Sequence, residues 1–514
     1  MFDTNDLSGL KMEIKNLKWF FTIYLIFLLS FLAYQMMTTN FNIKLTSISL
    51  IFLFILGSFI LVFISKRNLP LYKIAFIVIL IFGLCCVFIT PIVTVCDETE
   101  HFWRSEITSE GQLFPNYVDI PNSNKSGYEA KGYETIASMS PLYKNTGNTI
   151  FNTNWDDLSI NYTTAYVSSA FCQNPFYGYI PQAIGIDIAK GLNLNNIWML
   201  WFGRIANLLM FAFVCSYAIK KAPIFKIPLF ITATLPLTIY QAASLSIDAT
   251  VNSFAILTIA YFLYMYKAEK NSLDYKNLLT FLIISLIGGF TKVTYMGLLL
   301  LIFLVPKDNF KDRKVEHSRI IGFIGVILID LLWTKLYATK HLLNSWRGTY
   351  FIKNNVNILG QLTYMAHHPL NSLYLLFTPD NLINVISGYF SFGNLPPYTS
   401  TFLVVTFLIF YVILSFLYPQ EIKLDRKSKI GVFFIGLLIF IGTYLIQYLT
   451  WCNVGMSRIE GVFGRYFIPL LVLGPMIFGL KESNKNEKNS QLLVITMMIG
   501  FISSMILLTI MKFY

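Results

Sequence analysis

The chain has 514 residues, of which 55% are hydrophobic and only 13% charged, with 39 Lys and Arg against 27 Asp and Glu. Soluble proteins carry about 25% charged residues, so this composition excludes a soluble enzyme and a disordered protein. The basic excess argues against nucleic-acid binding, because in a lipid-embedded chain such an excess usually orients the membrane spans.

Long apolar runs predict an all-α polytopic membrane protein with about thirteen transmembrane helices. A bilayer core needs about 20 apolar residues per helix. Two shorter runs flank Gly288-Gly289 and Thr291-Lys292, and we interpret them as short spans that meet at a polar turn. The predicted spans are 19–37, 46–65, 72–93, 196–219, 227–243, 249–266, 277–290, 293–305, 319–337, 401–418, 430–450, 461–480 and 490–511.

The short connections with clustered Lys and Arg set the predicted orientation in the cell membrane. If all of them are cytoplasmic, the N-terminus is cytoplasmic and the C-terminus extracytoplasmic. The first span has no small-residue cleavage signature after it, so it is predicted to be a retained anchor. The predicted segments are three spans in 1–93, an outer loop in 94–195, spans four to nine in 196–337, a second outer loop in 338–400 and four spans in 401–514.

The two long outer loops, 94–195 and 338–400, contain most of the loop residues, which indicates that the protein acts outside the cytoplasm. No internal repeat is evident, so the sequence gives no support to an inverted-repeat transporter. The chain has no Walker motif, no GxGxxG and no HExxH, so no nucleotide cofactor is expected.

An acidic motif follows the third predicted span. In a helix, Asp97, His101 and Arg104 share one face because of their i, i+4, i+7 spacing. Partial desolvation at the membrane boundary is expected to raise the pKa of Asp97 or Glu98 toward the range of a general base, with His101 orienting it. Arg104 offers a bidentate phosphate contact. The alternative is an acidic helix end with a Glu100–Arg104 surface salt bridge.

Further polar residues lie near the outer ends of other predicted spans. Ionisable groups at membrane depth are costly and are functional candidates, although snorkelling to the interface is the alternative for each one. These candidates are Arg204, Ser246, Asp248, Lys292, Tyr295, Arg465 and Tyr466.

Two weaker patterns point to metal or disulfide chemistry. His367-His368 lacks a spaced third ligand, so ordinary loop histidines are favoured over a zinc site. Cys96 and Cys172 both fall in the first outer loop, and a disulfide between them stays open.

Five ordered motifs resemble a bacterial multi-spanning family known as domain of unknown function 2142. They are Asp97-Glu98-x-x-His101-x-x-Arg104, "PFYGYIPQAIGIDIAKGLNL" leading into Gly203-Arg204-x-x-Asn207, "LPLTIYQAASLSIDATVN", Lys292-Val293-Thr294-Tyr295 and "GVFGRYFIP" from Gly461. Together they extend over about 95–470, most of the chain.

That family is similar in architecture to the GT-C class of membrane glycosyltransferases, although here the acidic motif follows the third predicted span and not the first. The resemblance implies inverting transfer of a sugar from a polyprenyl-phosphate donor to an extracytoplasmic glycan or lipid acceptor of the cell envelope. Asp97 or Glu98 would be the base. Arg465, Arg204 and Lys292 would stabilise the leaving phosphate. Asp97, Glu98 and Asp248 are the residues that would hold a divalent cation, if one is used.

Two other functions stay open. A flippase or exporter of lipid-linked polysaccharide would place its charges mid-span along a path between the two sides. A polysaccharide polymerase shares the many spans and the outer loops, and would join two lipid-linked glycans.

Overall fold

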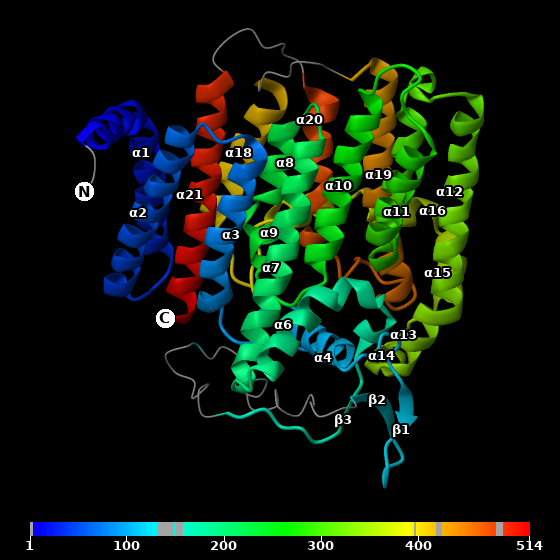
Figure 1. Cartoon of the computed structure of the whole chain (residues 1–514). Coiled ribbons are helices and arrows are strands. Elements are labelled where there is room, and N and C mark those ends of the chain that lie inside the picture. Colours follow the sequence, from blue (N-terminus) through cyan, green and yellow to red (C-terminus); the bar gives the residue numbers. More distant parts are fainter. Residues whose placement is uncertain (1–3, 131–148, 150–157, 395–396, 418–423, 480–486) are drawn as a thin grey trace.

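The structure is a computed structural model that describes residues 4–130, 149, 158–394, 397–417, 424–479 and 487–514. It is a bundle of long, roughly parallel helices, with a small layer of short elements at one end (Figure 1). Among the described residues, eight helices are long and apolar enough to cross a membrane, and four more apolar helices have 10–17 residues. This confirms an all-α polytopic membrane protein, while the number of thirteen spans stays a prediction.

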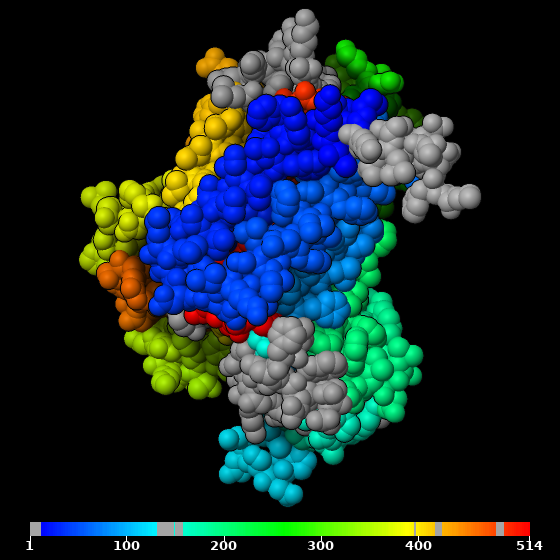
Figure 2. Space-filling model, turned by 90° about the vertical axis from the view of Figure 1, so that its left-hand side faces the viewer, coloured from blue at the N-terminus to red at the C-terminus, as the bar shows by residue number. Residues whose placement is uncertain are grey.

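The N-terminal part is three helices: α1 (Thr4–Thr38), α2 (Ile43–Arg67) and α3 (Leu71–Ile89). Asn42 caps α2, because its side chain accepts a hydrogen bond from the Leu45 backbone N–H. In Figure 2, α1 and α2 cover one side of the molecule. Their outward side chains are apolar and exposed, as expected of a surface that contacts lipid.

The central helices follow the first long segment. They are α7 (Asn196–Lys221), α8 (Lys226–Ala233), α9 (Pro236–Ala242), α10 (Asp248–Tyr266), α11 (Tyr275–Thr291), η4 (Val293–Leu304), η5 (Lys307–Asn309) and α12 (Arg313–Trp333).

The predicted span 227–243 is not one continuous helix. It breaks between α8 and α9, where Pro236 opens α9 and cannot continue a hydrogen-bonded helix from α8. The predicted short span 293–305 is also unusual, since η4 is a 3-10 helix of 12 residues. At about 2.0 Å per residue, a 3-10 helix extends farther across a membrane than an α-helix of equal length.

The segment 94–195 is an ordered layer where the structure describes it, and its residues 131–148 and 150–157 lie outside the described part. Its sheet is antiparallel with strand order β1-β2-β3, pairing Tyr117 with Tyr128 and Tyr128 with Val167. The hairpin projects from the molecule (Figure 2). The elements are α4 (Glu98–Ser109), β1 (Tyr117–Asp119), β2 (Ser126–Ala130), β3 (Ala165–Val167), η2 (Ala170–Gln173), η3 (Phe176–Tyr179) and α6 (Ile180–Gly191).

The segment 338–400 is largely helical and not an irregular loop. The helix that begins with α12 continues to Asn344, and later helices of this segment pack against α19 while exposing apolar residues such as Leu359 and Leu370. The elements are η6 (Thr334–Ala338), α13 (Thr339–Asn344), α14 (Trp346–Lys353), α15 (Ile358–His367), α16 (Pro369–Phe377) and α17 (Pro379–Gly388).

The C-terminal helices close the bundle. In the most apolar part of α21, 89% of the residues are buried, so the last helix of the chain is a central one. The Tyr514 hydroxyl donates to the Ile89 carbonyl, which places the end of α21 beside the end of α3. The elements are α18 (Thr401–Leu417), α19 (Arg426–Thr450), η7 (Gly464–Val472), α20 (Leu473–Phe478) and α21 (Glu487–Phe513).

Candidate active site

The turn between α3 and α4 presents the acidic motif. Two of its residues, Val93 and Asp97, adopt left-handed backbone conformations, with φ of 49° and 64°. This region is unfavourable for a β-branched residue and tolerated by Asp, so the surrounding contacts must hold the turn in place. Helix α4 begins only at Glu98, and Asp97 therefore stands just outside it.

A buried ion pair holds this turn. Arg204 of α7 contacts Glu98 through Nη2 at 2.6 Å and Nε at 2.8 Å, and neither side chain is exposed. Its Nη atoms also donate to the carbonyls of Val87, Thr90 and Pro91. Because the guanidinium binds the end of α3 and the start of α4 together, it fixes the turn that carries Asp97.

The same helix holds a second loop. Asn207, one turn after Arg204, donates through Nδ2 to the carbonyls of Ser244 and Ser246. The Leu245 backbone N–H donates to Glu98 at 3.3 Å. Helix α7 therefore sets the acidic turn and the loop before Asp248 relative to each other.

Arg465 connects the two carboxylates that these loops present. Its Nη2 lies 2.7 Å from Asp97 Oδ2, and its Nε lies 3.2 Å from Asp248 Oδ2. The side chain of Asp97 is 41% exposed, whereas those of Asp248 and Arg465 are 15% and 8% exposed. The result is a cluster of one guanidinium between two carboxylates, in which Asp97 is the most accessible member.

Lys292 supplies a second cation beside this cluster. It directly follows α11, and its Nζ lies 2.9 Å from the centroid of the Tyr466 ring, a close cation–π contact. The Tyr295 hydroxyl donates to the Tyr466 carbonyl at 2.9 Å, which ties η4 to η7. Tyr295 thus helps to position Tyr466, and through it the Lys292 contact.

His101 is held by side chains from three other segments. Its Nδ1 is 3.0 Å from the Tyr179 hydroxyl, its Nε2 is 3.5 Å from Ser246 Oγ, and its ring stacks on Phe171. Ser246 Oγ also accepts the Asp248 backbone N–H, so Ser246 links the histidine to the second acid.

These groups surround one cavity of about 290 Å³. It is lined by residues from six separate segments of the chain: Asp97 and His101; Phe171, Gln173 and Asn174; Ile247, Asp248 and Val251; Thr291, Lys292, Val293 and Thr294; Thr443, Ile446 and Gln447; Arg465 and Tyr466. Convergent charged groups in one cleft are the usual mark of a functional site.

The electrostatics of the acidic motif differ from the expectation. Burial acts to raise the pKa of Asp97, but Arg465 and His101 outweigh it, so its pKa is lowered and not raised. Burial lowers the pKa of His101 to about 4, against the opposing pull of Asp97 and Asp248. At neutral pH, Asp97 is therefore an ionised acceptor and His101 a neutral, orienting group.

Several predicted residues do not reach the cavity. Arg104 is buried behind the site, where it donates to Thr108 Oγ1 and the Leu113 carbonyl and lies 5.4 Å from the Tyr179 ring. The alternative interpretation, a Glu100–Arg104 surface salt bridge, is wrong, because the two side chains have other partners. The Glu100 carboxylate accepts hydrogen bonds from Ser169, from Ala170 and from Trp346 Nε1. Glu98 and Arg204 are likewise engaged with each other inside the protein.

The residues do not fit a carboxylate-held cation. Glu98 is turned away against Arg204, while Asp97 and Asp248 both contact Arg465. Within the described ranges, no three His, Cys, Asp or Glu side chains are grouped for metal binding, His367-His368 included. All six cysteines are free, so Cys96 and Cys172 are not bridged.

Sequence reasoning missed the uncharged part of the cavity. Thr443 and Gln447 of α19 are two such residues, and their i, i+4 spacing inside an apolar run was a usable signal. Gln173 and Asn174 carry no comparable signal, since polar residues are ordinary in a loop.

One comparison with known proteins, the scan against family profiles, found a match. The profile of the family described as "Predicted membrane protein (DUF2142)" matches residues 80–474, so it covers every site residue named above. No match was found among the curated proteins or among the solved structures. Because the match extends over most of the chain, the protein belongs to the DUF2142 family of predicted membrane proteins.

Proposed function

We propose that the protein is an inverting membrane glycosyltransferase that moves a sugar from a polyprenyl-phosphate donor to a glycan or lipid acceptor outside the cytoplasm. The observation that carries this proposal is the cavity in which Asp97, Asp248, Lys292 and Arg465 converge. It combines an accessible carboxylate with cations beside an apolar surface, as transfer from a lipid phosphate requires.

Asp97 is the proposed base. Both of its close contacts, with Arg465 Nη2 and Cys96 Sγ, involve Oδ2. The acceptor hydroxyl gives its proton to the carboxylate while its oxygen bonds to the anomeric carbon. The bond from that carbon to the phosphate oxygen breaks, and the polyprenyl phosphate leaves with the electron pair.

Lys292 is the proposed partner of the leaving phosphate. Arg465 is already shared by two carboxylates, whereas the nearest contact of Lys292 is the face of an aromatic ring. Negative charge that grows on the phosphate in the transition state is stabilised by a cation placed in advance. The next residue, Val293, lines the cavity and is 45% exposed, which would leave room for an apolar carrier chain in the bilayer.

The arrangement favours transfer over export. An exporter needs polar groups along a path through the bundle, but these charged residues lie at helix ends: after α3, at the start of α10, after α11 and at the start of η7. Polymerisation of two lipid-linked glycans would be recognised by products of increasing chain length.

The test uses purified protein in liposomes that contain polyprenyl-phosphate-linked sugars, with cell-envelope glycans and lipids as acceptors. Released polyprenyl phosphate and labelled product are measured together. Asp97→Asn is expected to lower turnover by about 10²–10⁴-fold, the usual contribution of a general base. Asn tolerates the left-handed conformation of residue 97, so folding is expected to survive.

The matched control is Asp187→Asn, the same change at an exposed position of α6 that does not line the cavity. Lys292→Met is expected to weaken the donor more than the acceptor, seen as a larger rise in the donor KM. Full turnover in Asp97→Asn would remove Asp97 from the base role, and translocation of labelled lipid without bond formation would contradict the proposal.

A further inference from the structure

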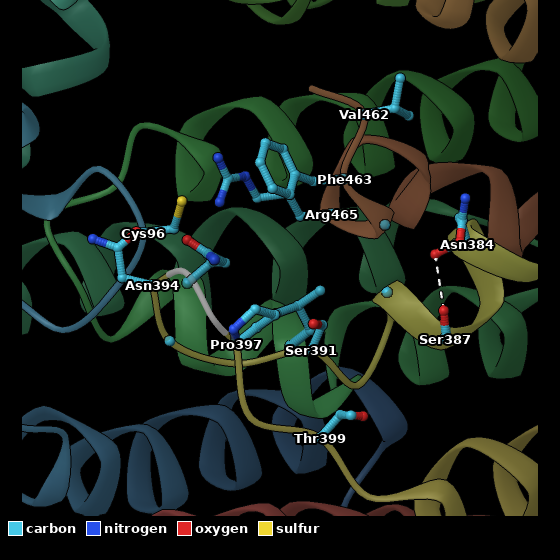
Figure 3. Close-up of a pocket in the computed structure, with 15 residues that line it drawn as sticks. Cys96, Asn384, Ser387, Ser391, Asn394, Pro397, Thr399, Val462, Phe463 and Arg465 are labelled. Atoms are coloured by element: carbon cyan, nitrogen blue, oxygen red, sulfur yellow. Dashed lines mark hydrogen bonds between the residues drawn. The ribbon is translucent and has the colours of Figure 1, made fainter. Parts of the chain in front are cut away.

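A second cavity, of about 250 Å³, lies beside Arg465. Figure 3 shows it between Arg465 and Cys96 on one side and Asn384 and Ser387 of α17 on the other. Arg465 lines both cavities. Cys96 lines this second cavity. The next residue, Asp97, lines the first cavity, which we call the charged cavity.

The lining of this cavity is polar but carries almost no charge. Apart from Arg465, its polar side chains are amides, hydroxyls and one thiol, among them Gln241, Asn384, Ser387, Ser391, Asn394 and Thr399. Such a set donates and accepts hydrogen bonds in several directions, which suits a ligand with many hydroxyl groups. A charged ligand would meet only Arg465, which two carboxylates already neutralise.

A buried amide side chain, Gln241, forms part of the wall of this cavity. Gln241 is 3% exposed, and its Oε1 has no hydrogen-bond partner among the described residues. Leaving a buried amide oxygen unpaired costs about 1–3 kcal/mol, so native proteins rarely do so without a reason. At the rim, Asn384 and Thr399 are exposed, so a ligand can reach the cavity from outside.

Two glycines bring the walls together. A Cβ on Gly464 would lie 2.3 Å from the Gly388 carbonyl carbon, and one on Gly388 would lie 2.7 Å from the Gly464 nitrogen. The backbones of α17 and η7 are therefore in direct contact, immediately before Arg465. This contact places the amide and hydroxyl groups of α17 next to the residue that binds Asp97.

We propose that this cavity, which we call the neutral cavity, binds an uncharged sugar ring and holds it beside Arg465, the residue that lines both cavities. The inference rests on the proposed function, because it assigns the sugar of that reaction to this site. The sugar comes from one of two sources, the donor or the acceptor, and both present the same hydroxyl-rich chemistry.

The deciding variant is Gln241→Leu, which keeps the side-chain size and removes the unpaired amide. Because the free protein loses a buried unsatisfied group, its thermal midpoint is expected to stay equal or to rise, whereas a purely structural glutamine would lose stability. Gln241→Glu, which keeps an acceptor oxygen, is expected to restore part of the binding. Gln491→Leu in α21 is the matched control, because it makes the same change outside both cavities.

Binding is measured in nanodiscs with undecaprenyl phosphate and with undecaprenyl-phosphate-linked glucose. If the donor sugar occupies the neutral cavity, Gln241→Leu weakens binding of the glucosylated carrier at least tenfold and leaves binding of the sugar-free carrier unchanged. If the acceptor sugar occupies it, both carriers bind normally and the acceptor KM rises at least tenfold. Normal values in both measurements overturn the inference.

A soluble probe separates this inference from the proposed function. Maltose, cellobiose and chitobiose are tested by saturation-transfer NMR with the whole protein in detergent. If neither carrier binds, the glycosyltransferase proposal fails. In that case, sugar signals that are present in the unsubstituted protein and disappear in Gln241→Leu would still support sugar binding in the neutral cavity. Signals that are absent, or unchanged by Gln241→Leu, contradict it.

Discussion

Asp97 is positioned by its own backbone conformation and not by helical spacing. The i, i+4, i+7 pattern correctly identified Asp97 and His101 as neighbours of one site, since both line the charged cavity. It failed for Arg104, which is fully buried behind Tyr179. Spacing rules hold only within a helix, and Asp97 precedes α4 with φ of 64°.

The choice between the two adjacent carboxylates also needed the structure. Glu98 is enclosed with Arg204, whereas Asp97 remains 41% exposed beside the cavity. Nothing local in the sequence separates these two acids, because the difference comes from a partner more than a hundred residues away. Sequence patterns identify ionisable candidates, while tertiary contacts assign each one to structure or to chemistry.

His101 predicts a pH dependence of stability. Its pKa of about 4 in the folded protein lies below its ordinary value of about 6.5, so between these values the unfolded chain binds more protons. Stability is therefore full above pH 6.5 and falls as the pH drops toward 4. We expect the thermal midpoint to decrease between pH 7 and pH 5, and to decrease less in His101→Gln. An unchanged slope in His101→Gln would show that His101 is not neutral in the folded protein.

At the scale of elements, hydropathy located the helices but not their internal breaks. Every predicted span coincides with one or two helices, because a helix that crosses a membrane must consist mostly of apolar residues. The division of 227–243 at Pro236 was readable from the sequence, since proline interrupts a helix. The 3-10 form of η4 was not readable, because the run contains no such breaker.

Helix α7 holds the two loops of the site in position through Arg204 and Asn207. Removing one partner of the buried Glu98–Arg204 pair leaves an uncompensated charge, at a cost of about 3–5 kcal/mol. We expect Glu98→Gln and Arg204→Met each to lower the thermal midpoint strongly. Turnover should fall with it, since the turn that carries Asp97 loses its anchor.

A double-mutant cycle distinguishes this pairing from two independent effects. The double variant Glu98→Gln with Arg204→Met should lose clearly less stability than the sum of the single losses, because the second change removes the charge that the first leaves unpaired. Additive losses would mean that the two residues stabilise the fold separately. The proposal that Glu98 and Arg204 hold the turn as a pair would then be wrong.

At the scale of the whole molecule, the charged cavity exists only because distant helix ends meet. Asp97, Asp248, Lys292 and Arg465 stand at the boundaries of four different elements, spread over 369 positions from 97 to 465. The topology of alternating spans predicted that these ends share one membrane side. It gave no information on which of them are neighbours around the bundle, because that depends on helix packing.

The side of the membrane on which this cavity opens is the remaining global prediction. The Lys- and Arg-rich connections are predicted to be cytoplasmic, which places the β1–β2 hairpin and the charged cavity outside. Single cysteines test this, because five of the six native cysteines are buried and the sixth is only partly accessible. Asn124→Cys, at the exposed hairpin tip, and Lys270→Cys, at a side chain 78% exposed, are the two reporters.

In intact cells, a membrane-impermeant maleimide is expected to label the Asn124→Cys protein and not the Lys270→Cys protein. After permeabilisation both should be labelled, and the unsubstituted protein gives the background in each condition. The reverse labelling pattern would place the charged cavity in the cytoplasm. The donor would then have to be available on that side, and soluble nucleotide sugars would compete as donors, which a polyprenyl-phosphate enzyme facing outward never encounters.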